Sequence, residues 1–238
     1  MVCAFVLFAM PAVARPGNAN SPAPASLSAV QIVQQMQQRN LARKEELKHF
    51  HDLRHYHVEY RGYSARVSAT MDVEVTYDAS SGKTFRILSQ SGSKLLFKHV
   101  LKRLIQSEEE AGREQKSTAL TPANYSFQLA GNDTIQGRPA YILHVEPLVP
   151  SKFLYKGKIW VDAADFAVER IDAEPAKNPS FWITRTQIRH QYTKTGDFWL
   201  PHEDRSETDV RVGGKAVLTI DYGTYQVEPA PLNEPPQH

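Results

Sequence analysis

The sequence predicts a mainly β protein with two helices: a half-open antiparallel β-barrel of about ten strands, covered by amphipathic helices. Three observations predict this fold. Apolar and polar residues alternate over long runs, Gly-, Asp- and Ser-rich turns separate the runs, and two segments carry apolar residues at helical spacing. A large twisted sheet of long strands must curl, and its concave face must be covered. The alternative is an outer-membrane barrel, against which the two helices and the Pro-rich C-terminus argue.

Length and composition are those of a single globular domain. The chain has 238 residues, of which 41% are hydrophobic and 23% charged, with a net charge of +2. One domain over residues 27–228 is long enough to bury a core without disulfides or a metal, and we expect it to be monomeric. The small net charge argues against nucleic acid as the main partner.

The N-terminus resembles an export signal. An apolar run is followed by small residues ending at Ala14, so we expect residues 1–14 to be a signal peptide cleaved near that position. Cleavage removes Cys3, the one cysteine, and leaves no thiol for a disulfide, a metal or lipidation. We therefore expect a soluble periplasmic product. Residues 15–26 have the composition of a linker, and residues 229–238 that of a disordered tail.

Two amphipathic helices are expected. Ser26 or Ser28 can cap the first, which runs to about Phe50. The second covers residues 94–113 and follows Ser91-Gly92-Ser93. It has an apolar stripe and a basic flank of Lys94, Lys98, Lys102 and Arg103. This flank is either an ordinary solvated surface or a contact with acidic lipid or a membrane complex.

The remaining chain alternates with period two, as half-buried strands do. Strands are expected from about residue 52 and then at 67–77, 83–89, 125–130, 138–146, 153–162, 166–173, 180–193, 197–211 and 215–228. We expect one continuous meander that is interrupted only by the second helix.

Four of the nine histidines fall within residues 49–57, HFHDLRHYH. On a strand, His55 and His57 project to one face, and such a pair can bind zinc if a third ligand is near. The alternatives are a pH-sensitive cluster and a polar outer face of the first strand. We favour the polar face, because Leu53 interrupts the row and histidine spacing alone is a weak metal signal.

Catalytic motifs are not found. The sequence has no G-x-S-x-G elbow, no Gly-rich phosphate loop and no H-E-x-x-H. Asp162 and Asp165 flank a turn, which they are expected to shape rather than to catalyse a reaction. The sequence therefore predicts a protein that is not an enzyme and that has no catalytic residues, cofactor or metal.

The segment FLYKGKIWVDAADFAVERIDAEP, residues 153–175, combines a strand, a tight turn and a second strand. A long strand with a Trp-Leu-Pro step and a final strand, KAVLTIDYGTYQV, follow. This order resembles the outer-membrane lipoprotein-sorting carrier (LolA/LolB-like) superfamily, over roughly residues 27–228. The resemblance implies a half-barrel around helices and an apolar cavity that takes acyl chains. It also implies no metal, no chemistry and, without a lipidation cysteine, the soluble carrier rather than the anchored acceptor.

The predicted function is thus a periplasmic carrier for lipoprotein acyl chains or another lipid, with an inner-membrane complex or an outer-membrane acceptor as a further partner. The alternative is an envelope sensor or scaffold that binds a protein with the same half-barrel. It predicts a filled core and an apolar patch or strand edge outside. Apolar residues of the two sheet halves and the second helix are predicted to line the cavity: Met71, Val73, Val75, Phe97, Leu101, Leu143, Val145, Trp160, Trp182 and Ile188.

Overall fold

The computed structural model describes residues 27–63, 65–113, 119–178, 181, 183–211 and 213–229. The predicted signal peptide and linker, the predicted tail beyond Pro229, and Trp182 lie outside the described residues.

Helix α1 (Ala29–Glu46) begins with a capping box: Ser28 accepts a hydrogen bond from the Gln31 backbone N–H, and the Gln31 side chain accepts one from Ser28. It ends at Glu46, so the prediction that it reaches about Phe50 is wrong. The reason is that strand pairing begins at Leu47, whose backbone is already extended.

The second helix is continuous but changes its winding. It consists of α2 (Lys94–Leu96), a π-turn labelled η1 (Phe97–Leu101) and α3 (Lys102–Arg113). Ser93 caps its first turn. Leu96 and Leu101 are five residues apart, and the wider π-turn lets both face the core together with Ile105. We call this whole segment the lid helix.

The strands form one antiparallel sheet. Their bounds are β1 (Leu47–Arg61), β2 (Arg66–Asp78), β3 (Gly82–Gly92), β4 (Tyr125–Ile135), β5 (Arg138–Pro147), β6 (Tyr155–Asp162), β7 (Val168–Pro175), β8 (Ile183–Thr195), β9 (Phe198–Val210), β10 (Lys215–Tyr222) and β11 (Gln226–Pro229). The predicted fold class, a half-open barrel with helices, is confirmed. The predicted last strand, residues 215–228, is instead two strands, β10 and β11. The strand is interrupted near Gly223, whose N–H donates to the Leu53 carbonyl.

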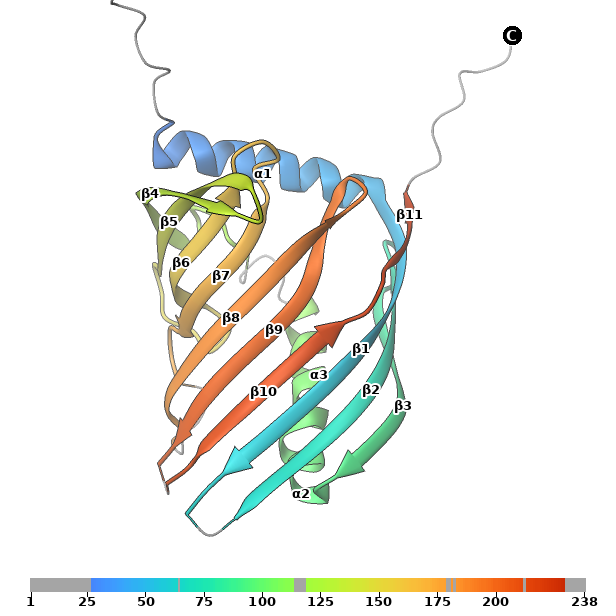
Figure 1. Ribbon diagram of the computed structural model, residues 1–238. Helices are drawn as coiled ribbons and strands as arrows, with labels where there is room; N and C mark the ends of the chain where they lie inside the picture. The colour runs from blue at the N-terminus through green and yellow to red at the C-terminus, as the bar shows by residue number, and fades with distance from the viewer. Residues whose placement is uncertain are drawn as a thin grey trace, which may run out of the picture.

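The strand order is β3-β2-β1-β10-β9-β8-β7-β6-β5-β4, with β11 also paired to β1. The meander is interrupted at the second helix, as expected, but the pairing of β1 with β10 was not predicted. Strands β3 and β4, which are consecutive in the chain, do not pair but form the two edges of the sheet, while β1 pairs with β10. The lid helix connects the two edges, and the sheet curves around it while α1 lies across one end (Figure 1).

The buried apolar residues form two clusters. The lid cluster joins the lid helix to β1, β2, β9 and β10: Phe50, Tyr56, Val58, Ala69, Met71, Val73, Val75, Leu96, Leu101, Ile105, Phe198, Leu200, Ile220 and Tyr225. The α1 cluster joins α1 to β4–β7: Ile32, Val33, Met36, Tyr125, Leu143, Val145, Leu154, Ile159, Val161, Ile171 and Ala173. None of the helices in the described ranges is long and apolar enough to span a bilayer.

Leu143→Ala should destabilise the fold by about 2–5 kcal/mol, because Leu143 has no exposed surface and its truncation leaves a cavity. Leu129, directly opposite on β4, is 39% exposed, so Leu129→Ala is the matched control and should cost less. Urea unfolding of both variants gives the comparison. Equal losses would contradict a core centred on Leu143.

Candidate binding site

The predicted cavity residues fall into separate groups. Met71, Val73, Val75 and Leu101 belong to the lid cluster, and Phe97 packs against it. Two others, Leu143 and Val145, belong to the α1 cluster. The sheet thus brings together the residues from β2 and the lid helix, but it does not join them to those from β5.

Two further predicted residues lie elsewhere. Trp160 is buried in neither cluster: its indole N–H donates to Asp133 at 2.9 Å and its ring lies under the Arg170 guanidinium at 4.6 Å. Ile188 on β8 is half-buried and is among the residues that line a hollow over β5–β9.

The interior under the lid helix is filled. Met71, Val73, Val75 and Leu101 have 0% exposure, and a side chain lining a cavity that admits water would have accessible surface there. The prediction that these residues hold an acyl chain therefore stays a prediction, and it requires the lid helix to move. The filled core is also what the alternative, a protein-binding scaffold, predicts.

A buried ion pair holds the lid helix to the sheet. The Arg54 side chain on β1 is 2% exposed; it donates to both carboxylate oxygens of Glu108 on α3, at 3.0 and 3.1 Å, and to Asp52 at 2.9 Å. Lys83 on β3 donates to Glu108 at 2.7 Å. Glu108 is thus held from two strands, and we call Glu108, Arg54 and Lys83 the latch.

Polar contacts continue from the latch across the inner face of the sheet. The Arg54 guanidinium lies 4.8 Å from the centre of the Tyr222 ring, and the Tyr222 hydroxyl donates to Asp204 at 2.7 Å. The other Asp204 oxygen contacts His190 Nδ1 at 2.6 Å. This polar line thus crosses β1, β10, β9 and β8, and the lid cluster and the α1 cluster share no residue.

The pKa shifts fit burial of the Arg54 end of the latch. Burial raises the pKa of Asp52, although Arg54 opposes the shift, and burial raises the pKa of Tyr56 to about 12. Burial acts to raise the pKa of Glu108, but Lys83 and Arg54 outweigh it, so the pKa of Glu108 is lowered. One Asp52 oxygen and the Tyr56 hydroxyl are buried without a hydrogen-bond partner, which costs stability.

The histidines lie where the polar-face interpretation puts them. His51 and His55 project from the outer face of β1, where they contact Glu74 at 3.2 Å and Asp72 at 2.7 Å. No three potential metal ligands come together among the described residues.

Asp162 shapes its turn as predicted. One carboxylate oxygen accepts the backbone N–H groups of Ala164 and Asp165, and both oxygens accept hydrogen bonds from Arg138.

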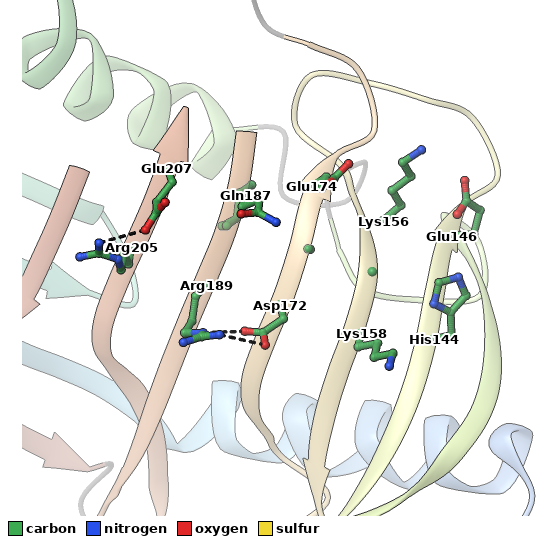
Figure 2. A pocket seen from close by; sticks show the side chains of 13 residues that line it. His144, Glu146, Lys156, Lys158, Asp172, Glu174, Gln187, Arg189, Arg205 and Glu207 are labelled. Atoms are coloured by element: carbon green, nitrogen blue, oxygen red, sulfur yellow. Dashed lines mark hydrogen bonds and ion pairs between the residues drawn. The ribbon is translucent and has the colours of Figure 1, made fainter. Parts of the chain in front are cut away.

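A hollow of about 640 Å³ lies on the opposite face of the sheet, over β5–β9 (Figure 2). Two rows of charged and polar side chains cross these strands. One row is His144, Lys158, Asp172, Arg189 and Arg205, and the other is Glu146, Lys156, Glu174, Gln187 and Glu207.

Backbone forms the floor of this hollow at Gly157, where β6 and β7 approach closely. A Cβ atom there would lie 2.4 Å from the Asp172 carbonyl oxygen. The rim charges largely neutralise one another, through Asp172 with Arg189 and Arg205 with Glu207. Such a surface suits a polar ligand rather than an acyl chain. Sequence reasoning missed it because its residues come from five strands and look like ordinary solvent-facing positions.

A second, more apolar hollow of about 440 Å³ is lined by residues of β1, β2 and the end of β10, with Leu88 of β3 at its margin. Its apolar members include Leu53 and Leu88, which are 51% and 46% exposed. The exposed Leu53 in the histidine row was the sequence signal for this surface.

No family model matches the chain. No curated protein matches it either. Several solved structures are similar in architecture. They include a DUF1329 family protein from Desulfovibrio piger (12% identity over 84% of this chain and 93% of that one, TM-score 0.42).

Two others are a putative outer membrane lipoprotein-sorting protein domain from Vibrio parahaemolyticus (11% identity, 84% and 94% covered, TM-score 0.39) and a LolA superfamily protein from Nitrosomonas europaea (14% identity, 87% and 96% covered, TM-score 0.36). One of these similar structures is thus a member of the superfamily that the sequence resembles. At these scores the likeness carries no argument about function.

Glu108→Gln should destabilise the protein by about 1–3 kcal/mol at neutral pH, because it leaves Arg54 buried with a weakened partner. The pKa of Glu108 is lowered from its ordinary 4.5 on folding, so its ionisation stabilises the fold above that pH, and the contribution is lost as pH falls through the folded value. The gap between wild type and variant should therefore narrow below about pH 4.5.

The control is Glu109→Gln, an exposed neighbour whose replacement should cost less than about 0.5 kcal/mol. Chemical denaturation at several pH values measures both variants. A constant gap at all pH values would contradict the assignment of an ionised latch.

Proposed function

We propose that this protein is a non-catalytic periplasmic carrier that buries a lipoprotein acyl chain or another lipid beneath the lid helix. One observation supports the proposal above the others. The lid helix, which lies between the edge strands β3 and β4 in the chain, packs against β1, β2, β9 and β10 and supplies one wall of the larger apolar cluster.

The lid helix is the wall that can move without breaking the sheet. The strand order from β3 to β4 remains paired when the helix is lifted, whereas any other opening of the lid cluster separates paired strands. Lifting it breaks the contacts of Glu108 with Arg54 and Lys83 and exposes Met71, Val73 and Val75. The exposed apolar surface can then be covered by an acyl chain in place of the helix.

The energies permit such an exchange. Burial of a C16 chain gains roughly 10 kcal/mol before the costs of association. The ligand must offset the lost packing of Leu96, Leu101 and Ile105 and the broken latch, each a cost of a few kcal/mol. The two sides are of the same order, so loading and release are both feasible, as a carrier requires.

The alternative, a scaffold that binds a protein segment, has its own support. Strand β3 is an edge of the sheet, with Ile87 and Leu88 exposed, and Leu88 also contributes to the apolar hollow. A partner strand can add to such an edge through main-chain hydrogen bonds. The two functions predict different effects of mutation. Weakening the latch should change ligand uptake by a carrier, whereas altering the β3 edge should change protein binding by a scaffold.

Native mass spectrometry of the exported protein, purified without detergent, should detect a co-purifying lipid or acylated peptide. A fluorescent fatty-acyl probe should enter several-fold faster in Glu108→Gln than in wild type, because the latch is weakened, and Glu109→Gln should match wild type. A bare mass together with no probe uptake by any of the three proteins would reject the carrier. Capture of a protein that is lost in Leu88→Lys would then favour the scaffold.

A further inference from the structure

The exposed side of the lid helix is basic along its N-terminal two-thirds. Leu96, Leu101 and Ile105 face the core, and the opposite side is exposed. Residues 94–107 contain no Asp or Glu. The exposed positions of this stretch include four permanent cations: Lys94, Lys98, Lys102 and Arg103.

These charges oppose the stability of the helix that carries them. The first turn has no acidic residue and contains Lys94, although acids are favoured at a helix N-terminus. Lys94, Lys98 and Lys102 are four residues apart, a spacing at which like charges repel. The acidic residues 108–110 come late in the helix, where cations are preferred. Helix stability therefore does not account for this arrangement.

No described acidic side chain forms an ion pair with these four cations. Glu108 turns inward to the latch, and Glu110 contacts Lys152 at 3.8 Å. The row is thus a continuous positive strip on the one helix that fills the opening of the sheet.

An apolar residue completes this face. Leu95 is 68% exposed; it follows Lys94 in the chain and precedes Lys98 by three residues, a spacing at which helix side chains are neighbours. At the same end of the molecule lies the β1–β2 turn, which carries the 97% exposed Tyr63 (Figure 1). Exposed Leu and Tyr side chains among Lys and Arg are typical of surfaces that rest in the headgroup layer of a bilayer.

We propose that the basic face of the lid helix, formed by Lys94, Leu95, Lys98, Lys102 and Arg103, docks on the surface of an anionic phospholipid membrane. The complementary charge is a layer of lipid phosphates, because the cations form a row along a convex helix face rather than the lining of a pocket. Docking engages the element that must move for loading. The inference does not depend on acyl binding, because the face is formed whether or not the interior takes a ligand.

Co-sedimentation with pure-lipid vesicles tests the proposal. The full exported protein should bind phosphatidylcholine vesicles that contain phosphatidylglycerol but not vesicles of phosphatidylcholine alone, and added salt should weaken binding. Lys98→Glu/Lys102→Glu should bind at least about tenfold more weakly. Lys156→Glu/Lys158→Glu, an equal charge change at exposed positions of the outer hollow, is the matched control and should bind like wild type.

Circular dichroism checks that both double variants fold. The vesicle affinity of Lys98→Gln/Lys102→Gln, which removes charge without reversing it, should lie between that of Lys98→Glu/Lys102→Glu and that of wild type. Equal weakening by both double charge reversals would overturn the assignment of this face, and so would absence of binding to anionic vesicles. Uptake of the acyl probe from solution is measured in parallel. Loss of vesicle binding with uptake retained separates failure at this face from failure of the carrier.

Discussion

The pairing of β1 with β10 is the constraint on which the rest of this structure depends. It joins the early hairpins to the end of the later meander in continuous register from Arg54 opposite Tyr222 to Arg61 opposite Lys215. Because these strands pair, β3 and β4 are left as the two unpaired edges, and the sheet is open between them. The segment that connects these edges must cover the concave apolar face, and the lid helix does so with its apolar stripe.

The latch fixes the position of the lid helix on the sheet. Apolar contacts alone would tolerate several positions of the lid helix along the sheet, whereas Glu108 must meet both Arg54 and Lys83. Buried ion pairs add little net stability because their desolvation costs offset their attraction. Here the ion pairs fix the position of the lid helix without adding much stability, so weakening a single partner such as Glu108 is expected to loosen it. Tyr222, Asp204 and His190 form polar contacts across β10, β9 and β8, and the lid cluster and the α1 cluster share no residue.

Sequence patterns predicted the elements better than their assembly. Alternation placed the strands, and the serines before each apolar stripe (Ser26 or Ser28, and Ser91-Gly92-Ser93) placed both helix starts, because these signals are local. The pairing of β1 with β10 is a contact between distant segments, and no local pattern encodes it. The apolar side of β2 was predicted correctly as inward-facing. Its joining to a cavity with Leu143 was not confirmed, because Asp204 and His190, two polar residues in an alternating run, face inward between the two clusters. The latch was missed since Arg54 and Glu108 are 54 residues apart and each looks solvent-facing in sequence.

The most direct test of the central claim is photo-crosslinking with a fatty-acyl probe that carries a diazirine near its terminal methyl group, followed by peptide mapping. If the chain lies beneath the lid helix, the labels will fall on β2 around Met71 to Val75 and on the inner side of the lid helix at Leu101 and Ile105, and they will increase in Glu108→Gln. Labels confined to the outer hollows, or spread evenly over the surface in both proteins, would contradict the account.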